Sequence, residues 1–253
     1  MGEEGNLGLV RTLLEKEAGR HGLREALGVA LFPSVYGALM PVQKERLRKY
    51  SGDNFDELIR NGSVVSIAFA YPEHAIDSIA VGSEGGYDRE RWNIYAEEYI
   101  RLNDALDETS TTIASEIGGV AIPATIEGIA SKIGHVEDYY PLVVSHRMAA
   151  EQSGVGWRGK NGLIVNSEFS CAIRLASILI TLPMSRTPPT TMGCGECHAC
   201  LDACPILGNK EKLPNYREQC RLYIASLGLV SDVCGKCVKA CYRKSIYRDQ
   251  FRL

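Results

Sequence analysis

Eight of the nine cysteines of this 253-residue chain lie in its last quarter, and their spacing constrains the fold more than any other feature. The first four form the pattern C-x2-C-x2-C-x3-C, and Pro205 follows the fourth at once. This spacing is typical of bacterial ferredoxins, in which the thiolates bind a 4Fe–4S cluster. The other four supply the thiolates that a second cluster requires. The eight residues are Cys194, Cys197, Cys200, Cys204, Cys220, Cys234, Cys237 and Cys241.

In two-cluster ferredoxins the cysteine before the proline binds the other cluster. The same crossing here predicts a small ferredoxin-like module, in which the two halves of the segment wrap two clusters that lie close enough to exchange electrons. Cluster 1 would be bound by Cys194, Cys197, Cys200 and Cys241. Cluster 2 would be bound by Cys204, Cys220, Cys234 and Cys237.

Two other interpretations of the cysteines are weaker. Two C-x2-C pairs can form a zinc ribbon, but such a site needs neither the third C-x2-C step nor the Cys-Pro pair. A disulfide framework needs an oxidising compartment, and the sequence starts with no signal peptide. His198 lies inside the first motif and is expected to lie behind the cluster ligands or at the surface, because four cysteines are already available as ligands. Cys171, the ninth cysteine, opens an apolar run and is expected to be a buried structural thiol.

Length and composition indicate one α/β domain over residues 1–183 and the cluster module over 184–253. No apolar stretch reaches the length of a membrane span, so we expect a cytoplasmic protein with no membrane partner. The net charge is −3, but residues 188–253 hold ten Lys and Arg against six Asp and Glu. A basic module can compensate for anionic clusters, or it can form a docking face for an acidic electron donor or RNA.

The hydrophobic pattern predicts an α+β, α/β-like fold with one mixed sheet. Residues 63–71 (SVVSIAFAY) are apolar nearly throughout, as expected for a central strand that is covered on both faces. Apolar residues recur at helical spacing over 88–117, the longest predicted helix. Other helices are expected at 6–20, 41–49, 53–61 and 146–153, and other strands at 120–123, 163–166 and 172–181.

A glycine-rich loop, GVGWRGKNG, occupies residues 154–162. Its four glycines allow the backbone to approach a bulky ligand closely. Trp157 supplies a flat apolar surface, and Lys160 and Asn161 supply hydrogen-bond donors. The loop is not a Walker A motif, because neither Ser nor Thr follows Lys160, and it does not match the dinucleotide fingerprint.

Together with the cysteines, this loop resembles the epoxyqueuosine reductases and their shorter relatives, a group related to the reductive dehalogenases. The motifs GVGWRGKNGLIVN, AIRLASILITLP, CGECHACLDACP and CGKCVKAC follow in the family's order, and the resemblance covers about residues 90–241. It implies a nitroreductase-like domain that binds cobalamin, with two 4Fe–4S clusters that reduce the cobalt, and an electron donor such as ferredoxin or flavodoxin. The residues implied to lie near the corrin are Gly156, Trp157, Gly159, Lys160 and Asn161.

The sequence departs from this family in three places. The family's proton-donating aspartate falls near Tyr140, so Asp138, Tyr140 and His146 are the candidate proton donors. Ser177 and Thr181 stand where the family has acidic residues. The sequence stops twelve residues after Cys241, without the helical-repeat domain that helps to grip tRNA. These departures predict that tRNA is an unlikely partner and that the substrate is a different, unknown small molecule.

The sequence therefore predicts an iron–sulfur redox protein, a cobalamin-dependent reductase with two 4Fe–4S clusters. The alternative is an electron-transfer protein that delivers electrons to a corrinoid protein or to another redox partner. A lone histidine such as His146 is more often a hydrogen-bonded structural residue than a catalytic one. Asp138 adjoins Glu137, and adjacent acids usually form a solvated surface.

Overall fold

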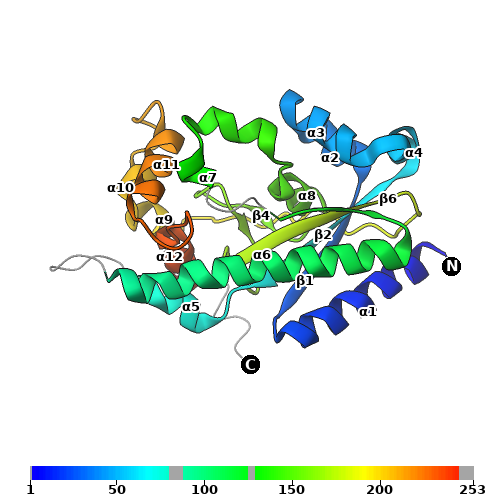
Figure 1. The fold of residues 1–253 in the computed structure, drawn as a ribbon, viewed down its shortest axis with the longest axis horizontal. Helices are drawn as coiled ribbons and strands as arrows, with labels where there is room; N and C mark the ends of the chain where they lie inside the picture. The colour runs from blue at the N-terminus through cyan, green and yellow to red at the C-terminus, as the bar shows by residue number, and fades with distance from the viewer. Residues whose placement is uncertain (1, 80–87, 125–128, 245–253) are drawn as a thin grey trace.

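A four-stranded sheet forms the centre of the molecule (Figure 1). The computed structural model describes residues 2–79, 88–124 and 129–244. Helices cover both faces of the sheet, which confirms the predicted α+β class. The strand order is β1 (Glu25–Leu31), β2 (Ser63–Ala70), β6 (Ile173–Ile180) and β3 (Val120–Ile122).

The sheet is antiparallel throughout, so the prediction of a mixed sheet is wrong. β2 and β3 run in the same direction, but β6 lies between them and is antiparallel to both. β1 is antiparallel to β2 at the other side. β6, the last of these strands in the sequence, thus separates β2 from β3. The sheet therefore contains no pair of adjacent parallel strands.

β2 is buried along its whole length, as expected for a central strand. Val65, Ile67 and Phe69 pack into the larger core on one face of the sheet. Val64 and Ala68 alternate with them and pack into two smaller cores on the opposite face. The unbroken apolar run therefore reflects burial on both faces.

Two long helices cover the face with the larger core: α1 (Glu3–His21) and α6 (Arg89–Ile117). α6 matches the predicted helix at both ends. Its N-cap, Asp88, accepts a hydrogen bond from the Arg91 N–H at 3.0 Å, and its C-cap, Gly118, adopts the left-handed conformation with φ 67°. Trp92 is fully buried on its inner face.

Shorter helices cover the opposite face. These are α2 (Phe32–Ala38), α3 (Pro41–Ser51), the 3-10 turn η1 (Gly52–Asn54), α4 (Phe55–Asn61) and α8 (His146–Gln152). The end of α8 lies against β1. A Cβ on Gly28 would stand 2.1 Å from the carbonyl oxygen of Ser153, so this close approach requires a glycine.

The C-terminal helices gather at one end of α6, beside α5 (Glu73–Ser78) (Figure 1). They are α9 (Ala199–Asp202), α10 (Pro205–Gly208), α11 (Tyr216–Ser226) and α12 (Lys236–Lys244). Val238 and Tyr242 of α12 join the larger core, together with Leu227 and Val233. The predicted boundary at 183/184 therefore crosses a shared core, and two separate domains remain a prediction.

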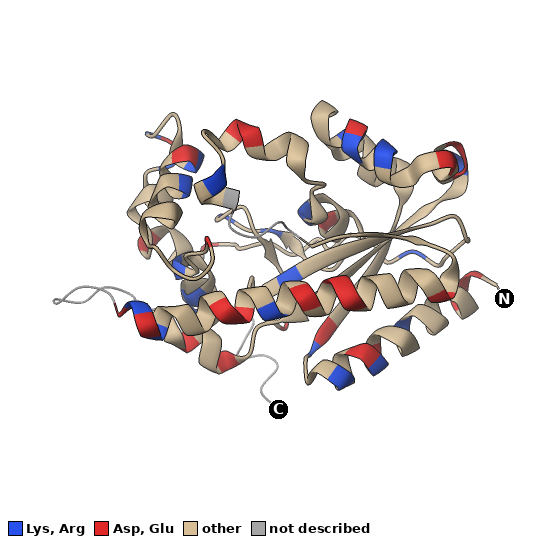
Figure 2. Cartoon of the chain, in the orientation of Figure 1, with Lys and Arg blue, Asp and Glu red and all other residues tan. Residues whose placement is uncertain are grey.

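Basic and acidic residues both occur on the C-terminal helices (Figure 2). Arg221 on α11 contacts Glu218, and Arg243 on α12 contacts Glu73 and Asp77 of α5. Part of the excess positive charge of this segment thus neutralises carboxylates of the protein itself. Among the described residues, none of the helices combines the length and apolar character that crossing a bilayer requires.

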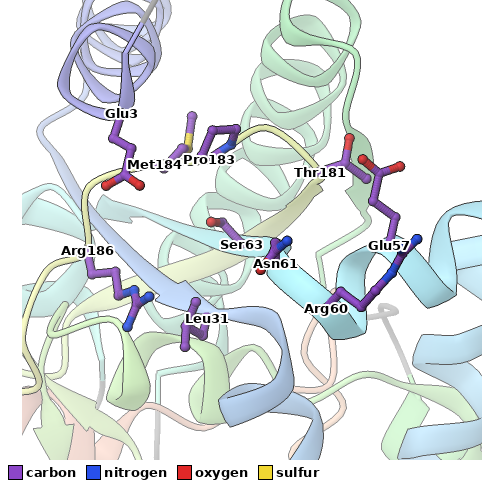
Figure 3. A pocket seen from close by; sticks show the side chains of 10 residues that line it. All are labelled: Glu3, Leu31, Glu57, Arg60, Asn61, Ser63, Thr181, Pro183, Met184 and Arg186. Carbon is purple, nitrogen blue, oxygen red and sulfur yellow. The ribbon is translucent and has the colours of Figure 1, made fainter.

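A cavity of about 470 Å³ opens at the end of the sheet where β6 finishes (Figure 3). Its lining is polar, with Arg60, Arg186, Glu3 and Glu57 among its side chains. Thr181 lines it just beyond β6, whereas Cys171 precedes the other end of the same strand. This cavity and the cysteines therefore lie at opposite ends of β6, and none of the predicted site residues lines the cavity.

Candidate metal centre

The structure gathers the C-terminal cysteines into two sets of four. The thiol of Cys200 has electrostatic neighbours in Cys194, Cys197 and Cys241. The thiol of Cys237 has neighbours in Cys204, Cys220 and Cys234. The sets match the two crossed groups of ligands that the spacing predicts. Cys237 also interacts with Cys200, so the two sets lie side by side. Iron binding by these sets stays a prediction.

The crossing begins at the Cys-Pro pair. Cys204 has an extended backbone with φ −137° and forms the N-cap of α10, while Pro205 takes the first helical position. Proline is favoured there because its fixed φ fits a helix start and it has no N–H to leave unpaired. The chain thus leaves α9 at Cys204, and this thiol joins Cys220 of α11 instead of Cys200 of α9.

The buried thiols fit the positively charged iron–sulfur core of a cluster. Burial and the neighbouring cysteines raise the pKa of Cys200 and Cys220 to about 11. Burial raises the pKa of Cys234 to about 11 as well, and that of Cys237 further. Thiolates are the form that binds metal. Four buried thiolates repel one another unless a positive charge lies between them, and iron ions supply that charge.

All nine cysteines are free thiols. Within residues 2–79, 88–124 and 129–244, no group of three His, Cys, Asp or Glu side chains is arranged to hold a single metal ion. A 4Fe–4S cluster has a different requirement, because each thiolate binds a different iron atom of the cluster.

The glycine-rich loop lies against the first cysteine motif. The Nζ atom of Lys160 donates a hydrogen bond to the carbonyl oxygen of Gly195 at 2.8 Å and lies 3.0 Å from Nε2 of His198. Lys210 donates to the carbonyl oxygen of Lys160 at 3.1 Å. Lys160 thus fixes the loop to the chain between Cys194 and Cys200.

Asn161 and Cys171 extend this connection to Cys241. Nδ2 of Asn161 donates to Sγ of Cys171 at 3.3 Å, and its Oδ1 accepts from the Leu163 N–H at 3.1 Å. Cys171 is only 3% exposed, as expected for a buried thiol. A hydrogen bond with Cys171 lowers the pKa of Cys241 and raises that of Cys171. No local sequence pattern could have predicted this interaction, because 69 intervening residues separate the two cysteines.

The other residues predicted near a corrin pack within the protein. They belong to a hairpin of β4 (Trp157–Arg158) and β5 (Ile164–Val165). A Cβ on Gly156 would stand 2.3 Å from the Val165 oxygen, and one on Gly159 would stand 2.7 Å from Cγ2 of Val165. Trp157 is 6% exposed and belongs to the larger core. Both glycines thus permit tight hairpin packing, and corrin contact stays a prediction.

Two candidate proton donors lie on η2 (Val136–Leu142), a 3-10 helix. Oδ2 of Asp138 accepts a hydrogen bond from the His135 N–H at 2.8 Å and caps the start of η2. The hydroxyl of Tyr140 accepts a hydrogen bond from Arg217 of α11 at 3.0 Å. Both side chains therefore have structural partners, and proton donation by either stays a prediction.

The third candidate, His146, is the buried first residue of α8. Its Nε2 atom is 2.7 Å from the carbonyl oxygen of Pro123, and its Nδ1 atom is 2.9 Å from Oγ of Ser177. A carbonyl only accepts, so Nε2 carries the proton and Nδ1 accepts from Ser177. Burial lowers the pKa of His146 to about 4. The ring is thus neutral near pH 7, and it links α8 to β6. Catalysis by His146 stays a prediction.

Sequence analysis gives no role to Arg174, a half-buried residue near the start of β6. The guanidinium of Arg174 stacks 4.1 Å from the centre of the Tyr99 ring, and its Nε donates to Asn103 at 2.9 Å. Burial opposes the charge, but Tyr99, Tyr71 and Tyr95 act against that effect, and the pKa of Arg174 is raised. Only its place in an otherwise apolar strand could have drawn attention to it.

The chain is similar to several curated proteins. It is 29% identical over 200 residues to the epoxyqueuosine reductase of Listeria monocytogenes, a match that covers 76% of this chain and 46% of that enzyme. A match to the epoxyqueuosine reductase of Salmonella typhimurium is 42% identical over 62 residues and covers 24% of this chain and 16% of that enzyme. The chain thus spans less than half the length of these relatives. No family model matches it.

Solved structures of the same enzyme also align with this chain. For epoxyqueuosine reductase from Streptococcus thermophilus, the TM-score is 0.49 at 20% identity, over 94% of this chain and 66% of that one. For an epoxyqueuosine reductase with an epoxyqueuosine-modified tRNA-Tyr stem loop, the TM-score is 0.42 at 19% identity, over 80% of this chain and 53% of that one.

These relatives contradict the prediction that tRNA is an unlikely partner. The curated proteins that match this chain are named for epoxyqueuosine, a modified nucleoside. Two of the sequence differences behind that prediction lie away from the cysteines or inside the protein. Ser177 is buried against His146, and Thr181 lines the cavity at the far end of β6.

Proposed function

Because this chain is a relative of the epoxyqueuosine reductases, we propose that it is an oxidoreductase that moves electrons through two 4Fe–4S clusters. The observation that carries this proposal is the division of eight cysteines into two adjoining sets of four. When bound, such clusters supply electrons one at a time. The electrostatic interaction between Cys237 and Cys200 supports a proximity of the two sites that would permit electron exchange.

The positions of the cysteines indicate where the two proposed clusters would lie along the path of the electrons. Cluster 2 would lie between α11 and the loop before α12, and cluster 1 would lie beside the glycine-rich loop. Lys160 and Asn161 connect that loop to the cluster 1 cysteines. Residues 1–183 would therefore supply the site to be reduced, and residues 184–253 would supply the electrons.

Cobalamin is part of this proposal only because the sequence resembles the epoxyqueuosine reductases, a resemblance that implies this cofactor. Gly156 and Gly159 pack against β5, Trp157 lies in the core, and Asn161 uses both ends of its amide within the protein. These contacts fit a loop that supports cluster 1 better than one whose side chains hold a corrin ring. We therefore assign no step of the reaction to cobalamin, and its binding is a matter for direct measurement.

The relatives also set the order in which substrates should be tested. Epoxyqueuosine in tRNA comes first, because the curated relatives are named for that nucleoside. The different small substrate predicted from the sequence comes second. Ferredoxin or flavodoxin would be the natural electron donor in either assay.

The proposal is tested by anaerobic purification, reconstitution with iron and sulfide, addition of hydroxocobalamin and desalting. We expect about eight irons per chain and EPR signals of two 4Fe–4S clusters. Four irons or fewer would contradict the two-cluster proposal. Retention of cobalamin would support a corrinoid-dependent reductase. Full iron content without cobalamin, and without turnover of modified tRNA, would favour the electron-transfer alternative.

A further inference from the structure

The cavity at the end of β6 is a candidate ligand site that lies apart from the cysteines. Its volume of about 470 Å³ falls within the range of pockets that hold small molecules. Segments that are distant in the sequence form it, among them the start of α1, the junction of α4 with β2, and the chain just beyond β6. The whole length of β6 separates this cavity from Cys171.

A buried hydroxyl group lines this cavity. Ser63, the first residue of β2, is only 2% exposed, and Figure 3 shows its side chain at the cavity. Its backbone pairs with Leu31 on one side and with Ile180 on the other, so its position in the sheet is fixed. In the part of the chain that the structure describes, this hydroxyl has no hydrogen-bond partner. Such a buried group costs free energy, and a ligand in the cavity would supply the partner.

Two arginines and two glutamates also line the cavity, and their formal charges cancel. In the view of Figure 3, Glu3 and Arg186 lie on one side of Ser63, and Glu57 and Arg60 lie on the other. Within the described residues, none of these four groups forms an ion pair with another, and the Arg186 side chain has no partner at all. The Nε atom of Arg60 donates to a main-chain carbonyl of its own helix at 3.2 Å. The cavity therefore presents unpaired charges of both signs.

A ligand with a single charge does not fit this lining. An anion would be attracted by the arginines and repelled by the glutamates, and for a cation the two effects would be reversed. A molecule with both a carboxylate and an ammonium group can pair with both kinds of side chain, through charge-assisted hydrogen bonds. A free amino acid is the simplest small molecule that carries these two groups.

We propose that this cavity is a binding site for a free amino acid. The two arginines bind its carboxylate, the two glutamates bind its ammonium group, and the Ser63 hydroxyl forms a hydrogen bond with it. The site goes beyond the proposed redox function and does not depend on it, because none of the cysteines and no residue of the glycine-rich loop lines the cavity.

The test begins with thermal unfolding of the full chain in the presence of each of the common L-amino acids in turn. We expect at least one of them to raise the melting temperature, because a ligand that binds the folded protein stabilises it. Isothermal titration calorimetry then measures its affinity. The amine that lacks the carboxylate and the N-acetyl derivative that lacks the positive charge should each bind at least about tenfold more weakly.

A matched pair of variants locates the binding. Arg186→Gln combined with Glu57→Gln removes one charge of each sign from the cavity and should weaken binding at least about tenfold. Arg11→Gln combined with Glu45→Gln removes the same two charges from exposed positions outside the cavity, and its affinity should be unchanged. Ser63→Ala should weaken binding as well. Circular dichroism checks that each variant is folded.

Four results would overturn the inference. The first is that no amino acid binds. The second is that the amine or the N-acetyl derivative binds as tightly as the amino acid, because the site would then recognise one charge only. The third is equal affinity in the cavity variant and its matched control, which would place the binding elsewhere. The fourth is displacement of the amino acid by inorganic phosphate at a similar concentration, which would indicate an anion site.

Discussion

Trp92 of α6 donates a hydrogen bond from its indole Nε1 to the carbonyl oxygen of Cys234, at 2.7 Å. The two residues are 142 positions apart, and Trp92 is fully buried. The next residue after Cys234 is Gly235, where a Cβ would stand 2.6 Å from Cε1 of Tyr95. The main-chain turn that carries Cys234, a proposed ligand of cluster 2, therefore packs directly against the side chains of α6.

Replacing Trp92 with phenylalanine should loosen this turn. The variant loses the hydrogen bond to Cys234 and part of a buried ring, and we expect a loss of about 2–4 kcal/mol in the free energy of unfolding. Urea unfolding followed by circular dichroism measures this loss. Iron analysis should also show a lower content of cluster 2. Phe32→Leu is the control, because Phe32 is equally buried but packs on the other face of the sheet. It should lose stability and keep its iron. An unchanged iron content in Trp92→Phe would show that the turn holds without α6.

The crossed ligand sets make a prediction that sequence order alone would not. Cys204→Ala should abolish the same EPR signal as Cys220→Ala, and Cys241→Ala should abolish the same signal as Cys194→Ala. Each variant should retain about four irons, because one cluster remains. EPR spectra and iron analysis of the four anaerobically reconstituted variants provide the measurement. If Cys204→Ala instead removed the signal lost in Cys194→Ala, the first four cysteines would form one uncrossed site.

His146 should make stability depend on pH. Its pKa is lowered from 6.5 to about 4 in the folded protein, because burial disfavours the charged ring. Near pH 6 the His146 ring therefore binds a proton in the unfolded chain but not in the folded protein. The free energy of unfolding consequently falls as the pH decreases below about 6.5. Between pH 7.5 and pH 5.5 this group should cost about 1.4 kcal/mol. His146→Gln keeps polar atoms at the site but does not titrate, so its unfolding free energy should change less over this range. Equal pH dependence in both proteins would contradict the assignment.

Gly28→Ala should destabilise the protein by about 1–3 kcal/mol, through overpacking of β1 against the Ser153 carbonyl. Gly37→Ala is a matched control in α2, where an added Cβ meets nothing within 4 Å. Alanine also favours helix over glycine by up to about 1 kcal/mol, so Gly37→Ala should be neutral or stabilising. Thermal unfolding compares the two directly. Equal melting temperatures would mean that α8 can move away from β1.

The sequence predicted the elements whose residues follow a strong local pattern. α6 and β2 were found because helical spacing and an unbroken apolar run leave few alternatives. β1 was missed, because Glu25–Leu31 contains Gly28 and alanines and only one β-branched residue, Val29. Its strand conformation comes from pairing with β2 along its whole length. Such tertiary stabilisation has no local signature.

In the candidate site, too, the features with a local sequence pattern were predicted and the features that depend on tertiary contacts were not. Metal-ligand spacing is a local property, so the eight cysteines could be singled out from the sequence, while their crossed ligation of two clusters stays a prediction. A Cβ on Gly156 or Gly159 would meet Val165, a close approach that the glycine pattern alone does not reveal, and corrin contact by this loop stays a prediction. The contact of Cys171 with Cys241 and the environment of Arg174 depend on which distant segments meet, and the sequence pattern contains neither.

The packing of the Cys234–Gly235 turn against α6 has a consequence for folding during synthesis. A ribosome completes the N-terminal part of a chain first. α6 therefore emerges well before the first of the eight clustered cysteines. By the time Cys234 and Gly235 appear, Trp92 and Tyr95 can already stand in place to receive them. In the nascent chain, the α6 side chains that contact this turn would thus be present before Cys234, a proposed cluster ligand, is synthesised. The iron–sulfur assembly machinery would then meet a thiol whose backbone is already held in place.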